Sequence, residues 1–188
     1  MSHSMADPAA LPDVAAVLAF WREAGPARWY AKDEEFDRTF TMRFEAAHMA
    51  AARGELMSWS GSAEGVLALL ILLDQFPRNA YRGTGHMFAT DGLARQVCEQ
   101  AIAAGLDRQG PEDLRQFYYM PLEHAEDLAA QEQCVRLMAP LHAETLRWAE
   151  IHRDIIARFG RFPHRNTVLG RVTTAEEQQF LDQGGFAG

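Results

Sequence analysis

The stretch Ala63-Glu64-Gly65-Val66-Leu67-Ala68-Leu69-Leu70-Ile71-Leu72-Leu73-Asp74-Gln75-Phe76-Pro77 decides the fold of this 188-residue chain. The residues from Val66 to Leu73 are all apolar, so a helix over 63–76 is hydrophobic on nearly every side. A helix of that kind is usually buried at the centre of a protein. Ser62 is suited to cap its start. Pro77 is expected to end it, because proline cannot donate to the helical hydrogen-bond ladder.

Further helices are expected on both sides of this central one, with limits set by capping residues, glycines and prolines. The expected segments are 13–24, 33–53, 84–104, 111–120, 122–138, 140–159 and 173–183. Thr173 and Glu176 have the spacing of a capping box at the start of the last segment. No segment alternates apolar and polar residues as a half-buried strand does. We therefore predict an all-α fold of seven to nine helices, stacked as antiparallel pairs and joined by short loops.

Length and composition are those of one globular domain. The chain is 48% hydrophobic, and a chain of this length buries roughly 70% of its surface on folding. Residues 1–7 are predicted to be a disordered tail or a cloning remnant, and residues 8–188 a single helical domain. Two cysteines, Cys98 and Cys134, cannot staple such a chain and are expected to be buried thiols. The absence of a signal peptide and of a long apolar run predicts a cytoplasmic protein.

The charge is unevenly distributed along the chain. The formal net charge is −8, which argues against a general nucleic-acid-binding protein. Residues 111–150 hold eight acids and three bases, whereas residues 151–171 hold five arginines and one acid. A basic stretch inside an acidic protein predicts either a local anion site or an internal network of ion pairs.

Three segments, 74–82, 117–126 and 158–171, place charged residues beside aromatic ones at helix ends. Charged groups in such places need partners if they are buried, and a ligand pocket uses the same combination of apolar walls and a few polar groups. The candidate ligand-binding residues are Asp74, Arg78, Asn79, Arg82, Tyr118, Glu126, His152, Arg158, Arg161, Arg165, Asn166 and Arg171.

These segments also carry a resemblance to a known family. Leu73–Asn79, Met120–Glu126 and Arg158–Asn166, followed by Leu169-Gly170-Arg171, resemble the bacterial domain-of-unknown-function 924 family. The resemblance covers about Val14 to Leu181. It implies an all-helical fold of the tetratricopeptide-like superfamily, a right-handed array of helical pairs, and it brings no established activity.

Residues 123–126 place two carboxylates and an imidazole within one helical turn. Glu123, His124 and His164 are candidate catalytic residues for acid–base chemistry. Alternatively, the acids of this turn pair with arginines in a structural network, or bind a metal together with His152 or His164. The spacings of established zinc motifs are absent, so no metal ligand and no cofactor are assigned.

Three functions remain open from the sequence. The first is the binding of a small anionic ligand or an acidic peptide end in a pocket lined by Arg, His and Glu. The second is an enzyme that acts on a small anionic metabolite with a His/Glu acid–base pair. The third is a scaffold stabilised by internal ion pairs. No nucleic-acid or membrane partner is expected, and His48, His142 and Asp91 are interpreted as surface residues.

Overall fold

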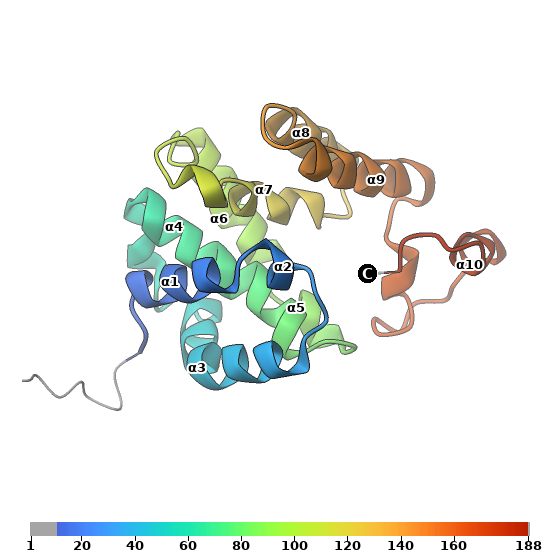
Figure 1. The fold of residues 1–188 in the computed structure, drawn as a ribbon. Coiled ribbons are helices and arrows are strands. Elements are labelled where there is room, and N and C mark those ends of the chain that lie inside the picture. The colour runs from blue at the N-terminus through green and yellow to red at the C-terminus, as the bar shows by residue number, and fades with distance from the viewer. Residues whose placement is uncertain (1–10, 188) are drawn as a thin grey trace, which may run out of the picture.

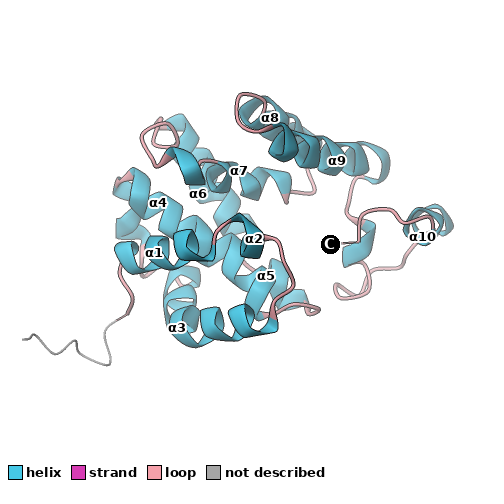
Figure 2. Cartoon of the chain, in the orientation of Figure 1, coloured by secondary structure: helices cyan, strands magenta, loops and turns pink. Residues whose placement is uncertain are grey.

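The computed structural model describes residues 11–187, so the tail predicted for residues 1–7 lies outside the described residues. Figure 1 shows the arrangement of the helices, and Figure 2 shows that the described residues form helices and loops without a strand. The α-helices are α1 (Val14–Ala24), α2 (Pro26–Trp29), α3 (Glu34–Ala52), α4 (Ala63–Leu70), α5 (Phe76–Ala80), α6 (Asp91–Ala103), α7 (Gln116–Glu123), α8 (Leu128–Met138), α9 (Ala143–Phe159) and α10 (Ala175–Asp182). The all-α prediction is confirmed, and the tetratricopeptide-like array stays a prediction.

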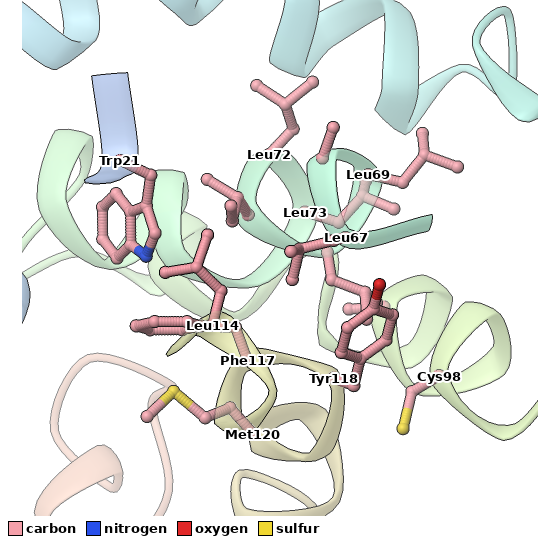
Figure 3. Close-up of a cluster of buried hydrophobic side chains, with 14 of the residues drawn as sticks. Trp21, Leu67, Leu69, Leu72, Leu73, Cys98, Leu114, Phe117, Tyr118 and Met120 are labelled. Atoms are coloured by element: carbon pink, nitrogen blue, oxygen red, sulfur yellow. The ribbon is translucent and has the colours of Figure 1, made fainter. Parts of the chain in front are cut away.

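Helix α4 lies at the centre of the main core and packs against α1, α6 and α7. Figure 3 shows Leu67 of α4 in one buried cluster with Phe117 and Tyr118 of α7. Helices α8 and α9 lie side by side, and α10 and the C-terminal end follow beyond them (Figure 1). A smaller apolar cluster around Ile155, Ile156 and Phe162 forms beside α10. Within residues 11–187, no helix combines the length and the apolar character that crossing a membrane requires.

The prediction that Pro77 ends the central helix is wrong. The helix continues through a π-helical turn, Ile71–Gln75, into α5, and Pro77 occupies the first turn of α5. The π-turn and the proline leave carbonyls without their usual helical partners. Nδ1 of His48 lies 2.9 Å from the carbonyl of Leu72, and the Thr90 hydroxyl donates to the carbonyl of Leu73 over 2.5 Å. Side chains from other elements therefore stabilise the interruption. His48 is 5% exposed, so its prediction as a surface residue is also wrong.

Helix α7 contains Pro121, so the predicted break before that residue is wrong as well. The helix runs only two residues beyond the proline, to Glu123. The next helix begins at Leu128 rather than at Leu122, because the carboxylate of Asp127 accepts a hydrogen bond from the backbone N–H of Ala130 and caps it. The short segment between the two helices carries the polar residues of 123–126.

Further boundaries differ from the prediction: α7 begins at Gln116 instead of 111, after the 3-10 turn Glu112–Leu114, and α9 begins at Ala143 instead of 140. The segment expected as a helix over 84–104 is a 3-10 turn, Gly85–Phe88, followed by α6. The capping box of α10 joins Thr174 and Glu177, one residue later than the predicted Thr173 and Glu176. That register is favoured because it buries Glu177 beside Arg161, whereas Glu176 stays exposed.

Candidate functional site

The two interrupted helices meet at a contact between Asp74, in the π-turn, and His124, at the end of α7. His124 Nδ1 lies 2.7 Å from Asp74 Oδ1. Burial raises the pKa of Asp74, but the charges of Arg78 and His124 lower it further, to about 2. An ionised carboxylate only accepts hydrogen bonds, so the proton of this contact is on His124 Nδ1. The Nε2 atom of His124 consequently keeps its lone pair and can act as a base.

Glu123 and His124 are neighbours whose pKa values move in opposite directions. Burial, reinforced by the negative charge of Asp74, raises the pKa of Glu123 to about 8. Burial and the positive charge of Arg78 lower the pKa of His124, against the influence of Asp74. At pH 7 the carboxyl is therefore protonated and the imidazole is neutral. Divergent pKa values of this kind identify an acid and a base within one site.

His152, on α9, lies beside this pair. Its Nδ1 atom is 2.9 Å from the carbonyl of Trp148 and 3.5 Å from Glu123 Oε1, and its ring centroid is 6.3 Å from that of His124. Burial lowers the pKa of His152 to about 3, with a further contribution from His124. His152 is therefore a neutral side chain next to the protonated carboxyl of Glu123.

Asp91 pairs with two arginines next to Asp74 and His124. Arg78 donates two hydrogen bonds to the carboxylate of Asp91, over 2.9 and 3.1 Å, and also lies 3.2 Å from Asp74 Oδ1. Arg165 donates to Asp91 over 3.3 Å and to the carbonyl of His124 over 3.0 Å. The interpretation of Asp91 as a surface acid is therefore wrong, and two carboxylates here face two guanidinium groups. We call this set the buried cluster: Asp74, Arg78, Asp91, Glu123, His124, His152 and Arg165.

Arg165 is packed as tightly as a core residue. It is 6% exposed, and its guanidinium carbon lies 4.4 Å from the ring centroid of Phe88 and 4.4 Å from that of Phe162. Burial and the nearby charge of Arg78 lower its pKa to about 10, which leaves it charged at neutral pH. The contacts with two rings and with Asp91 hold the segment after α9 against α6 and α7.

A second set of ion pairs holds the C-terminal region in place. Arg171 donates to Glu126 over 2.7 and 2.9 Å, and Glu126 also accepts from the backbone N–H of Phe162. Arg161 donates to Glu177 over 2.6 and 2.8 Å. With Asn166, which bonds to both Arg171 and Glu177, these residues form what we call the C-terminal clasp: Glu126, Arg161, Asn166, Arg171 and Glu177.

The arginines of residues 158–171 thus all have acidic partners, with Arg158 paired to Glu176 at 2.9 Å. The sequence left open whether these arginines form a local anion site or a network of internal ion pairs. In the described part of the chain the paired arrangement is the one observed. The anion site therefore stays a prediction. Among the described residues of 158–171, no arginine is left without an acidic partner to support it.

The structure places the other candidate residues in several surroundings. Tyr118 is in the main core, where its hydroxyl donates to the carbonyl of Ala63, and Arg82 pairs with Asp37 on α3. Asn79 is 7% exposed and forms no hydrogen bond with the buried cluster within residues 11–187. His164 packs on Phe162, and burial and Arg165 lower its pKa to about 4.

Sequence reasoning missed the residues that support the buried cluster. Besides His48 and Thr90, the side-chain amide of Gln131 donates to the carbonyls of Glu123 and Ala125, on either side of His124. A lone glutamine inside α8 has no spacing that would indicate this role. No group of three or more potential metal ligands is arranged to hold an ion in the part of the chain that the structure describes.

Comparisons with known proteins add the following. The model of a bacterial family of proteins of unknown function, DUF924, matches residues 17–185. The solved structure of a protein of unknown function from Agrobacterium tumefaciens is 54% identical, with a TM-score of 0.89, and the match covers 91% of this chain and 97% of that one. No match is found among curated proteins.

Proposed function

Because this chain belongs to the DUF924 family, bacterial proteins of unknown function, the activity has to be inferred from its own residues, and we propose that it is an enzyme that moves a proton on a small anionic metabolite. The observation that carries the proposal is the 2.7 Å contact between His124 and Asp74. A buried carboxylate that fixes the ring and tautomer of a histidine is how many enzymes prepare a general base.

Each residue of the buried cluster has a role in this proposal. Nε2 of His124 accepts a proton from the substrate, and the protonated carboxyl of Glu123 donates one. Asp74 orients His124 and stabilises the imidazolium that forms. Arg78 keeps Asp74 ionised, so that it acts as a hydrogen-bond acceptor throughout the reaction.

The exposure of these side chains supports a site at which only the histidine is reached from outside. The side chain of His124 is 14% exposed, whereas the side chains of Asp74 and Glu123 are 2% and 6% exposed. A substrate that approaches from solvent meets the imidazole first, because it is the most exposed of these three side chains. A dry surrounding of this kind strengthens electrostatic interactions during proton transfer.

The charge of the substrate is inferred from the histidines around the cluster. After burial, the charge of Arg165 contributes to the lowered pKa of both His152 and His164. Positive charge next to a ring favours a negatively charged group there. Because Asp91 already pairs with Arg165, the proposal of an anionic substrate concerns only the immediate surroundings of these two histidines.

The proposal is tested by incubating the purified protein with a panel of small carboxylates and phosphate esters and following their conversion by mass spectrometry. We expect turnover that falls roughly 100-fold or more in His124→Gln, the usual size of a general-base contribution. The matched control is His142→Gln, because His142 is an exposed histidine at the start of α9. Turnover that survives in His124→Gln would remove the histidine from the reaction.

A purely binding function gives a different outcome in the same experiment. A ligand from the panel would then bind without being converted, and His124→Gln would change only its affinity. A scaffold function would leave the panel unbound and unconverted. Either result contradicts the proposed enzyme.

A further inference from the structure

Phe186, beyond α10, packs against two histidines next to the buried cluster. Its ring centroid lies 4.6 Å from that of His152 and 5.2 Å from that of His164, and both pairs of rings meet edge to face. Figure 1 shows the chain after α10 turning back toward the rest of the molecule. Phe186 is half-buried and His152 is only 6% exposed, so the phenyl ring is part of what covers this imidazole.

Two glycines direct Phe186 to this place. Gly184 has a φ of +80°, a left-handed conformation that side chains disfavour. A Cβ atom on Gly185 would lie 2.5 Å from the ring of Phe180 and 2.6 Å from its carbonyl oxygen. The backbone N–H of Gly185 donates to that same carbonyl over 2.9 Å, which closes the end of α10. The sequence Gly184-Gly185-Phe186 is therefore a tight turn that ends with an aromatic ring on His152.

We propose that Phe186 is a positioning residue of the acid–base site, whose ring covers His152 and keeps water from the contact between His152 and Glu123. The inference rests on the proposed function for the role of Glu123. A carboxyl that has to deliver a proton needs surroundings without water, because water would stabilise its ionised form. Phe162 also meets His152 edge to face, with ring centroids 5.5 Å apart, so two phenyl rings pack on this imidazole.

The titratable and charged groups that face His152 are Glu123 and His124 from α7, and His164 and Arg165 from the 3-10 turn Pro163–Arg165. Of these, only Glu123 is an acid, and it is protonated at neutral pH. No carboxylate among them therefore holds a proton on His152, and admission of water is the change that lets this ring ionise. The protonation state of His152 consequently reports whether water reaches the ring.

The test is a pH titration of the histidine ring protons by NMR in the full chain. In the unaltered protein we expect His152 to titrate near pH 3. In Phe186→Ala its pKa should rise toward the ordinary value of 6.5, because water then reaches the ring. Gly185→Ala keeps the phenyl group but prevents the turn, so it should raise the pKa in the same direction. Phe186→Leu restores an apolar cover, so the pKa of His152 should stay close to its value in the unaltered protein.

The matched control is Phe159→Ala, because Phe159 belongs to the same small apolar cluster and packs on Phe180 instead of a histidine. His48, buried in the main core against Phe76, serves as an internal reference for a folded protein. An unchanged titration of His152 in Phe186→Ala and Gly185→Ala overturns the proposal. A shift of equal size in Phe159→Ala also overturns it, since the effect would then be a general loosening.

This outcome is separable from that of the proposed function. If the titration shifts as expected but no metabolite is converted by the unaltered protein, Phe186 covers His152 and the enzyme assignment fails. If turnover depends on His124 but His152 titrates alike in all variants, the enzyme stands and the role of Phe186 fails. If the pKa of His48 also rises to its ordinary value in Phe186→Ala, that variant is unfolded. The titration of His152 in Gly185→Ala then tests the role of Phe186.

Discussion

His124 and Asp74 share a hydrogen bond of 2.7 Å although 50 residues separate them in the chain. Each residue lies where a helix departs from regular geometry, Asp74 in a π-turn and His124 at the end of a helix that contains a proline. Side chains from other elements bind the two backbone carbonyls before Asp74 and the carbonyls on either side of His124. The contact therefore depends on the tertiary fold as a whole, and its disruption should affect stability as well as activity.

We expect Asp74→Asn to lower stability and to flatten its acid dependence. The folded-state pKa of Asp74 is about 2, below its ordinary value of 3.8. A depressed carboxyl pKa contributes stability above pH 3.8 that is lost as the pH falls toward 2, here about 2 kcal/mol. Urea denaturation at several pH values between neutral and acid measures this. Equal acid sensitivity of the variant and the unaltered protein would contradict the ion-paired state of Asp74.

Glu123→Gln is expected to increase stability at alkaline pH. The pKa of Glu123 is raised to about 8 in the folded state, from an ordinary 4.5, so folding takes up a proton between these values. Stability therefore falls as the pH rises from 4.5 to 8, and the amide, which does not titrate, removes that loss. Denaturation curves at pH 5 and at pH 9 check this. If Glu123→Gln instead became less stable than the unaltered protein as the pH rises, Glu123 would be ionised and paired.

At the C-terminal clasp, two adjacent acids, Glu177 and Glu176, are expected to contribute differently to stability. Hydrogen bonds from Arg161, with further help from Thr174, lower the pKa of Glu177 to about 2. We expect Glu177→Gln to lower the free energy of unfolding by about 2 kcal/mol, because charge-assisted bonds to a buried carboxylate are lost. The matched control is Glu176→Gln, whose side chain is 63% exposed and should contribute below about 0.5 kcal/mol. Similar losses in both variants would contradict a buried, ordered clasp.

Arg165 should matter more for stability than Arg158 does. Removal of the Arg165 side chain leaves Asp91 with one arginine fewer and opens a gap between Phe88 and Phe162. We expect Arg165→Ala to cost about 3–5 kcal/mol, the range for breaking a buried ion pair. Arg158, whose side chain is 51% exposed, is the control and should cost little on replacement by alanine. Thermal and urea denaturation of both variants give the comparison.

The sequence predicted much of the fold because its strongest signal, the apolar run 66–73, depends on local pattern alone. It did not predict that the helix would pass through Pro77, since the hydroxyl of Thr90 that accommodates the freed carbonyl of Leu73 comes from a distant turn. Similarly, Glu123, His124 and Asp74 were found as candidates because they are polar residues at helix ends. Asp91 was missed because an acid at the start of a helix normally faces solvent, and only the packing of Arg78 and Arg165 shows otherwise.

The protonation state and tautomer of His124 test the proposed base most directly. Long-range proton–nitrogen NMR spectra of the ring, recorded from pH 8 downward, distinguish the two neutral tautomers from the charged form. We expect a neutral ring at pH 7 with the proton on Nδ1, a pKa below 6.5, and loss of this preference in Asp74→Asn. A charged imidazole at pH 7, or a proton on Nε2, would leave no basic nitrogen for a substrate and would contradict the proposed base.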